Sequence, residues 1–181
     1  MRELYIGIDS GTQSTKALVV NAKNGKVLGS GQRAYGLIKG LPAGATEQHP
    51  EAWKKATAAA IKAALKEAKA SAAEVKGIGV SGQQHGFVPL DKNGGVIRPA
   101  KLWCDTTTGR ECETITKKLG GLKKTISRVG NAMLPGFTAP KIAWLKKHEP
   151  KNYRRLATVL LPHDYLNHWF TGNAVMEYGD A

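Results

Sequence analysis

A short segment near the start of the chain combines glycine, small hydroxyl residues and one acidic residue. It runs Gly7-Ile8-Asp9-Ser10-Gly11-Thr12-Gln13-Ser14-Thr15-Lys16, between two strand-like runs. Glycine and small hydroxyl residues let main-chain amides approach an anion closely, and a carboxylate at a strand end can hold a hydrated cation. These features suit a nucleotide phosphate tail with Mg²⁺. An ordinary polar hairpin with turn hydrogen bonds is the alternative.

A second polar loop follows a strand-like run later in the chain, with the sequence Gly79-Val80-Ser81-Gly82-Gln83-Gln84-His85-Gly86. The carboxyl end of a buried strand is where α/β sheets usually place ligands. Gln84 and His85 offer donors and acceptors that suit sugar hydroxyls. A plain polar loop with a satisfied surface histidine would explain them as well.

A third candidate segment contains Trp103 and Asp105. An indole gives a flat wall for the carbon face of a polyol, and a carboxylate can accept its hydroxyl protons. The alternative is structural: Trp103 would belong to the core, and Asp105 would cap the following helix.

The elements that must position these residues are predicted to form a mixed sheet covered by helices. Strands are expected at Leu4–Asp9, Ala17–Val20 and Lys26–Gly29, and Asn24-Gly25 is a dipeptide favoured in tight hairpins. A core-covering helix is expected over Pro50–Lys69, with a buried stripe of Trp53, Thr57, Ile61 and Leu65. Ser71 and Glu74 then resemble a capping box before a buried strand at Val75–Val80.

The rest of the chain is predicted to be mainly helical. A hairpin signal at Asn93-Gly94 separates two short strand-like runs, 87–90 and 96–97. Helices are expected at 107–119, 122–128, 138–148, 152–156 and 162–170, and strands at 158–161 and 174–176.

The charge balance restricts the possible partners. Lys and Arg number 27 against 14 Asp and Glu, which gives a net charge of +13 and would attract phosphate-bearing ligands or nucleic acid. Many lysines fall on the solvated face of the 50–69 helix, which argues against a nucleic-acid partner. No run approaches the roughly 18 apolar residues of a membrane span, so no membrane partner and a cytoplasmic location are predicted. Cys104 and Cys112 are predicted to be free thiols.

Taken in order, these segments resemble the FGGY family of carbohydrate kinases. The first hairpin is similar to the phosphate-binding hairpin of the actin, hexokinase and heat-shock chaperone superfamily. This resemblance implies an α/β, ribonuclease-H-like domain whose mixed sheet opens with three antiparallel strands and is flanked by helices. Residues 136–148 resemble the first FGGY signature throughout. Burial and a helix cap at Thr138 explain that segment, so we assign it no chemistry.

The resemblance also implies roles for individual residues. Asp9 would act in catalysis by holding Mg²⁺ through water, and the turn that follows it would bind the phosphates of ATP. The loop at 81–86 is similar to the Ser-Gly-Gln-Met-His-Gly loop of xylulose kinases, with Gln84 in place of Met. The implied reaction is ATP-dependent phosphorylation of D-xylulose to D-xylulose 5-phosphate. The implied phosphate-binding residues are Gly11, Thr12, Gln13, Ser14 and Lys16, and the implied ketose-binding residues are Gln84, His85, Trp103 and Asp105.

The family places its catalytic base after the region matched here. We therefore expect residues 1–181 to be a truncated amino-terminal domain that lacks the base, beyond Ala181, and the carboxy-terminal domain, and to be inactive alone. A kinase for another ketose or polyol, such as ribulose or glycerol, and a non-catalytic sugar-binding module remain the alternatives. The resemblance leaves a homodimer of the full-length enzyme open.

Overall fold

The protein is described by a computed structural model that covers residues 2–179. It divides into two compact units, one made of residues 2–37, 49–83 and 162–175 and the other of residues 38–48, 84–161 and 176–179. The expectations for the end of the chain at Asp180 and Ala181 lie outside the described residues.

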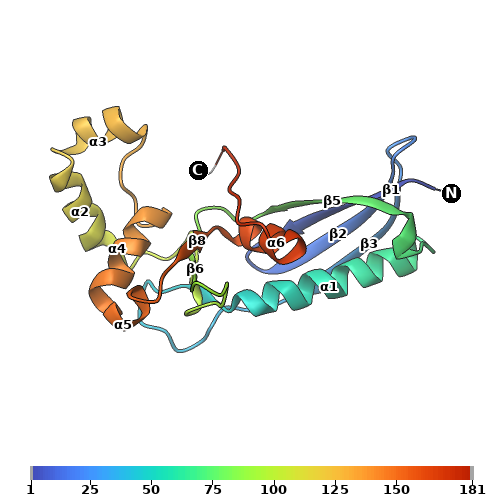
Figure 1. Cartoon of the computed structure of the whole chain (residues 1–181), viewed down its shortest axis with the longest axis horizontal. Coiled ribbons are helices and arrows are strands. Elements are labelled where there is room, and N and C mark those ends of the chain that lie inside the picture. The colour runs from blue at the N-terminus through green and yellow to red at the C-terminus, as the bar shows by residue number, and fades with distance from the viewer. Residues whose placement is uncertain (1, 180–181) are drawn as a thin grey trace. The chain divides into compact units, whose positions relative to one another are not determined.

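A four-stranded sheet forms the centre of the first unit (Figure 1). Its strands are β1 (Leu4–Ser10), β2 (Ser14–Asn21), β3 (Val27–Ala34) and β5 (Val75–Gly82), in the order β3-β2-β1-β5. The first three strands are antiparallel, and β5 runs parallel to β1. The predicted mixed sheet that opens with three antiparallel strands is therefore confirmed.

One face of this sheet is buried under helix α1 (Pro50–Glu67). The side chains of β1 alternate, with Leu4, Ile6 and Ile8 buried against the helix. The buried stripe of α1 differs from the prediction, because Ile61 and Leu65 are only partly buried while small residues fill the interface. The buried residues of α1 are Pro50, Trp53, Ala56, Thr57, Ala60 and Ala64.

Small residues dominate this interface because the backbones of helix and sheet approach closely. A Cβ atom built on Gly29 would lie 2.3 Å from the Ala64 carbonyl oxygen, and one on Gly31 would lie 2.2 Å from the Ala60 oxygen. Real Cβ atoms do not approach backbone atoms so closely. The close contact between β3 and α1 therefore requires glycine in the strand and is made with alanine in the helix.

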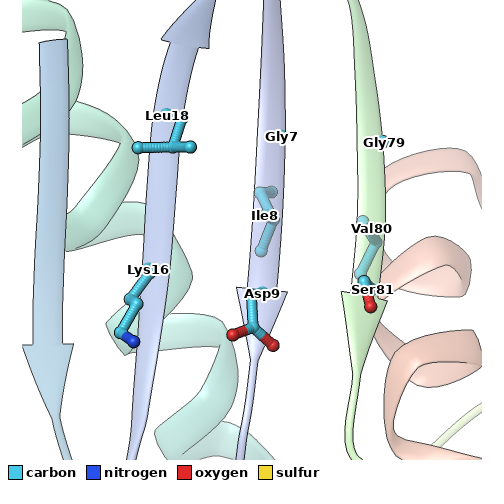
Figure 2. Close-up of a pocket in the computed structure, with 8 residues that line it drawn as sticks. All are labelled: Gly7, Ile8, Asp9, Lys16, Leu18, Gly79, Val80 and Ser81. Carbon is cyan, nitrogen blue, oxygen red and sulfur yellow. The ribbon is translucent and has the colours of Figure 1, made fainter. Parts of the chain in front are cut away.

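A second helix, α6 (Pro162–Thr171), packs against α1 and β5. The rings of Trp53 and Tyr165 meet edge to face, with their centroids 6.4 Å apart. The two helices cover the same side of the sheet, and the opposite side of β1, β2 and β5 carries exposed side chains (Figure 2). The predicted capping box at Ser71 and Glu74 is also present, at the short 3₁₀ helix η1 (Ala72–Glu74).

The second unit consists of two small antiparallel ribbons and a set of helices. One ribbon pairs β4 (Glu47–Gln48) with β7 (Ala100–Lys101), and the other pairs β6 (Val88–Leu90) with β8 (Thr158–Leu160). Its core includes Phe87, Val88, Leu90, Leu102, Leu145 and Leu160. The helices are α2 (Gly109–Lys118), α3 (Leu122–Val129), α4 (Thr138–His148) and α5 (Pro150–Tyr153).

One local prediction was wrong, and another is confirmed only in part. Residues 174–176 form no strand, and the Val175 side chain is 55% exposed. The turn at Asn93-Gly94 forms, but beyond it only a single bridge joins Val96 to Leu90.

Among residues 2–179 no helix is both long and apolar enough to cross a bilayer.

Candidate functional site

The β1–β2 hairpin places Asp9 on the exposed face of the first unit's sheet. Asp9 lies opposite Lys16 of β2 and opposite Ser81 of β5 in the strand register. Because side chains alternate along a strand, Asp9 points away from α1 while its neighbours Ile8 and Ser10 are buried. Figure 2 shows the Asp9 carboxylate and the Lys16 side chain on the same face of the sheet. A carboxylate and an ammonium group thus meet the solvent beside the turn.

A cavity of about 560 Å³ lies on this face. Gly7 and Gly79 are direct neighbours in the β1–β5 register, and a Cβ atom on either would meet nothing within 4 Å. The protein's own packing therefore does not require glycine at these positions, and their small size leaves the sheet surface beside Asp9 bare. The lining residues are Gly7, Ile8, Asp9, Lys16, Leu18, Gly79, Val80 and Ser81 (Figure 2).

The turn of this hairpin is closed by its own backbone, because the Gly11 amide donates to the Ser14 carbonyl at 3.0 Å. Thr12 and Ser14 are half-buried and Gln13 is exposed. The structure therefore brings all the predicted phosphate-binding residues to one hairpin, with Lys16 at the start of β2. An exposed carboxylate at a strand end fits hydrated Mg²⁺, which usually keeps several waters and binds through one or two carboxylates.

Tyr35 fixes the hairpin and was missed by the sequence reasoning. Its hydroxyl group donates to the Gly11 carbonyl oxygen at 2.6 Å and lies 3.2 Å from the Ser10 hydroxyl and 3.3 Å from that of Thr15. Burial raises the pKa of Tyr35, so the phenol stays protonated and can donate at neutral pH. No sequence pattern marks a single tyrosine in a loop as the partner of a turn 24 residues earlier.

Gln83 ties the end of β5 to the same hairpin. Its backbone N–H donates to the Ser10 carbonyl oxygen at 3.0 Å, and the Thr12 hydroxyl donates to the Gln83 side-chain oxygen at 3.4 Å. At Gly82 a Cβ atom would lie 2.8 Å from the Ser10 oxygen, so the close approach requires glycine. The phosphate-type hairpin is therefore held from two sides.

His85, in the second unit, adopts a backbone conformation that is rare for a residue with a side chain. Its φ angle is +53°, in the left-handed region, which costs about 1–2 kcal/mol for most residues. Its carbonyl oxygen accepts hydrogen bonds from Thr138 Oγ1 at 3.1 Å and from Lys141 Nζ at 2.8 Å. Its imidazole meets the ring of Phe137 edge to face, with centroids 4.8 Å apart. Gln84 beside it is exposed.

The contact of Thr138 with His85 replaces a predicted helix cap. The N-cap residue of α4 is Phe137, and no side chain caps the helix there. The Thr138 hydroxyl is directed to the loop of His85 instead. The signature segment therefore supports the predicted ketose loop, which the sequence analysis did not foresee.

Trp103 presents half of its side chain to solvent. A Cβ atom on Gly136 would lie 2.7 Å from the Trp103 carbonyl oxygen, so the segment that precedes α4 abuts the tryptophan's backbone. A half-exposed indole can offer its face to the carbon skeleton of a sugar. Trp103 is therefore not a core residue, and its contact with a sugar stays a prediction.

Asp105 is completely buried. Its Oδ1 accepts from the Thr107 amide at 3.0 Å, and its Oδ2 accepts from the Thr46 amide at 2.9 Å and from Lys101 Nζ at 3.0 Å. Burial opposes ionisation, but the hydrogen bonds from Thr107, Thr46 and Lys101 outweigh it and hold the pKa of the carboxyl below its ordinary value. Its binding to the ketose stays a prediction, which this burial disfavours.

Asp105 belongs to a buried network of charges. Arg98 Nη2 contacts Glu47 at 2.7 Å and Arg98 Nε contacts Glu149 at 3.1 Å, while Lys101 Nζ lies 3.2 Å from Glu47. The Lys101 ammonium also lies 4.1 Å from the centroid of the Trp144 ring. Buried ion pairs contribute little net stability, but breaking one is costly, so they select a single geometry. Here they fix the backbone on both sides of Trp103.

The mixed sheet, with an acidic residue on its first hairpin and helices on one face, defines the actin/hexokinase-like class of carbohydrate kinase domains. The structure of xylulose kinase from Rhodospirillum rubrum superimposes with a TM-score of 0.88 at 28% identity, over 97% of this chain and 35% of that one. Gluconate kinase from Lactobacillus acidophilus shares the fold, with a TM-score of 0.85 at 22% identity, over 96% of this chain and 34% of that one.

Residues 4–181 match the N-terminal domain of the FGGY family of carbohydrate kinases, and the chain belongs to that family. It is 44% identical to xylulose kinase of Haemophilus influenzae over 98% of this chain and 37% of that protein. It is 42% identical to xylulose kinase of Bacillus subtilis over 97% of this chain and 34% of that protein. The chain thus spans little more than a third of the length of these relatives.

Proposed function

We propose that this chain belongs to an enzyme that transfers the γ-phosphoryl group of ATP to the terminal hydroxyl of D-xylulose, giving D-xylulose 5-phosphate. The observation that carries the proposal is the exposed Asp9 carboxylate, which lies beside an open cavity on a hairpin held by Tyr35 and Gln83. The relatives named xylulose kinases support the choice of substrate.

In this proposal the hairpin binds the phosphate end of ATP. The turn from Gly11 to Ser14 approaches the phosphate oxygens, and the Lys16 ammonium offsets their charge. Asp9 would hold Mg²⁺ through water, and the ion would supply positive charge to offset that of the phosphate oxygens. Since Tyr35 and Gln83 already fix the turn, it needs little ordering when the nucleotide binds.

Gln84, His85 and Trp103 orient the ketose in the proposed enzyme. The amide and the imidazole bind its hydroxyl groups, and the half-exposed indole of Trp103 covers its carbon face. We propose that Asp105 acts structurally and fixes the loop of Trp103 through its buried hydrogen bonds. In this proposal the base that accepts the hydroxyl proton comes from a part of the enzyme outside residues 1–181, since these residues match little more than a third of the xylulose kinase relatives. Residues 1–181 alone are therefore expected to show no turnover.

The replacement Asp9→Asn in the full-length enzyme tests the proposal. Without the negative charge the hydrated cation is poorly held, and kcat should fall on the order of 100-fold, the loss typical of one preorganised electrostatic group. The Mg²⁺ concentration needed for half-maximal rate should rise, while the affinity for the ketose stays the same. The matched control is Glu113→Gln, which changes an exposed carboxylate on α2 and should leave kcat as it is.

Wild-type kcat and Mg²⁺ dependence in the Asp9→Asn variant would remove Asp9 from the mechanism. Calorimetry of the full-length protein with D-xylulose separates the alternatives. Binding of the ketose without any phosphorylation in the presence of ATP would favour a non-catalytic sugar-binding module. A stronger preference for ribulose or glycerol would place the enzyme elsewhere in the family.

A further inference from the structure

Lys141 is a cation in the interior of the second unit. It lies in α4 within the signature segment, and its side chain has no solvent exposure. Its ammonium group donates to two backbone carbonyl oxygens, those of His85 and Gly136. An uncharged side chain of similar length would avoid the desolvation of a charge. We therefore infer that lysine serves at position 141 through the hydrogen bonds that its ammonium group donates.

The first of these hydrogen bonds acts on His85. The left-handed backbone of His85 is unfavourable by itself, so it must be held by its contacts. Lys141 Nζ at 2.8 Å and Thr138 Oγ1 at 3.1 Å converge on the same carbonyl oxygen. The direction of the imidazole follows from this backbone conformation and from the edge of the Phe137 ring.

The second hydrogen bond acts toward Trp103. The Gly136 carbonyl accepts from Lys141, and the Cα of Gly136 lies so close to the Trp103 carbonyl oxygen that a Cβ atom would be only 2.7 Å away. One ammonium group therefore joins the loop that carries His85 to the segment that abuts Trp103. His85 and Trp103 lie 18 residues apart in the sequence. Lys141 of α4 contacts both the loop of His85 and the segment beside Trp103.

We propose that Lys141 is a positioning residue for the ketose: it fixes His85 and Trp103 relative to each other, so that both meet the same sugar molecule. This inference rests on the proposed function, in which those two side chains contact the ketose. Lys141 does not touch the substrate. Its loss should weaken binding of the sugar without changing binding of the nucleotide, because the hairpin of Asp9 makes none of these contacts.

The replacement Lys141→Met in the full-length enzyme provides the test. Methionine keeps the length and the apolar stem but removes the donors. We expect the KM for D-xylulose to rise about tenfold, equivalent to roughly 1.4 kcal/mol. The KM for ATP should change less than about twofold, as expected when only sugar binding is affected. Thr138→Val, which removes the other donor to the His85 carbonyl, should raise the ketose KM in the same direction by a smaller factor.

Lys147→Met is the matched control. Lys147 lies in the same helix, but its side chain is 57% exposed and its ammonium group lies a long 3.4 Å from Glu111. It should leave both KM values as they are. If Lys141→Met does not fold, Thr138→Val still tests whether the contacts at the His85 carbonyl position the ketose, and an unchanged ketose KM in Thr138→Val would then count against the inference.

His85→Ala separates this inference from the proposed function. If His85→Ala raises the ketose KM while Lys141→Met and Thr138→Val do not, the positioning role of Lys141 is wrong and the ketose site stands. If His85→Ala leaves the ketose KM unchanged, the proposed ketose site itself fails. An equal rise of the KM values for ketose and ATP in Lys141→Met would indicate general damage and would also overturn the inference.

Discussion

The replacement Asp105→Asn separates a structural from a sugar-binding role for this carboxylate. Both oxygens of Asp105 act only as acceptors, toward Thr107 on one side and toward Thr46 and Lys101 on the other. An asparagine side chain has one acceptor oxygen, so its NH₂ group must face donors in either orientation. The substitution also leaves the buried Lys101 with one carboxylate fewer.

The size of the effect follows from these contacts. Breaking a buried ion pair by removing one partner destabilises a protein by about 3–5 kcal/mol. Lys101 keeps its contact with Glu47 at 3.2 Å, so we expect the lower end, about 3 kcal/mol. Chemical denaturation of the full-length enzyme, followed by the fluorescence of the tryptophans near the network, measures the loss. Glu113→Gln, an exposed carboxylate, serves as the control.

The acidic range gives a second readout for the same variant. The pKa of Asp105 lies below its ordinary value in the folded protein, so its carboxylate contributes stability that is fully present above that ordinary value. This contribution is lost as the pH falls below about 4 toward the folded-state pKa. The stability of the variant should therefore fall less steeply with acid than that of the wild type. A variant of wild-type stability with a raised ketose KM would refute the reasoning and return Asp105 to the sugar site.

Two further substitutions test other parts of the structure. Tyr35→Phe removes the hydroxyl group that donates to the Gly11 carbonyl at 2.6 Å. Since one neutral hydrogen bond contributes about 1 kcal/mol, we expect the KM for ATP to rise between about threefold and tenfold. An unchanged KM for ATP in steady-state kinetics would show that the hairpin does not need this contact. Gly31→Ala would place a Cβ atom 2.2 Å from the Ala60 carbonyl oxygen and should destabilise the protein by about 2–3 kcal/mol in urea unfolding. The control Gly7→Ala should not, because its Cβ atom would meet nothing within 4 Å. Equal stability of the two variants would contradict the close helix–sheet contact.

The strands and helices were predictable where periodic patterns or turn residues are local. The three opening strands and the helix that became α4, at Thr138–His148, follow from such signals. The failures occur where tertiary contacts decide. In α1 the alanines are buried ahead of Ile61 and Leu65, because only small side chains fit against the glycines of β3. Residues 174–176 are apolar enough for a strand but form none.

The candidate site shows the same division. The first hairpin was identified from its own residues, since the residues expected to bind one ligand group are consecutive. The residues that hold the loops in place were not, because Tyr35 and Lys141 act on partners 24 and 56 residues away. Thr138 was interpreted as a helix cap, its usual local role, and is instead used for a contact with His85. Sequence separation removes the pattern on which such predictions depend.

The glycines of β3 have a consequence for the energetics of the proposed nucleotide binding. Because Gly29 and Gly31 bring the main chain of the sheet against that of α1, the two elements meet through backbone atoms rather than through side chains that could change rotamer. A sheet and a helix packed in this way can shift little relative to each other. The loop mounted on them is expected to enter the bound state with little entropy to lose, so that more of the intrinsic attraction between the loop and a polyphosphate appears as affinity.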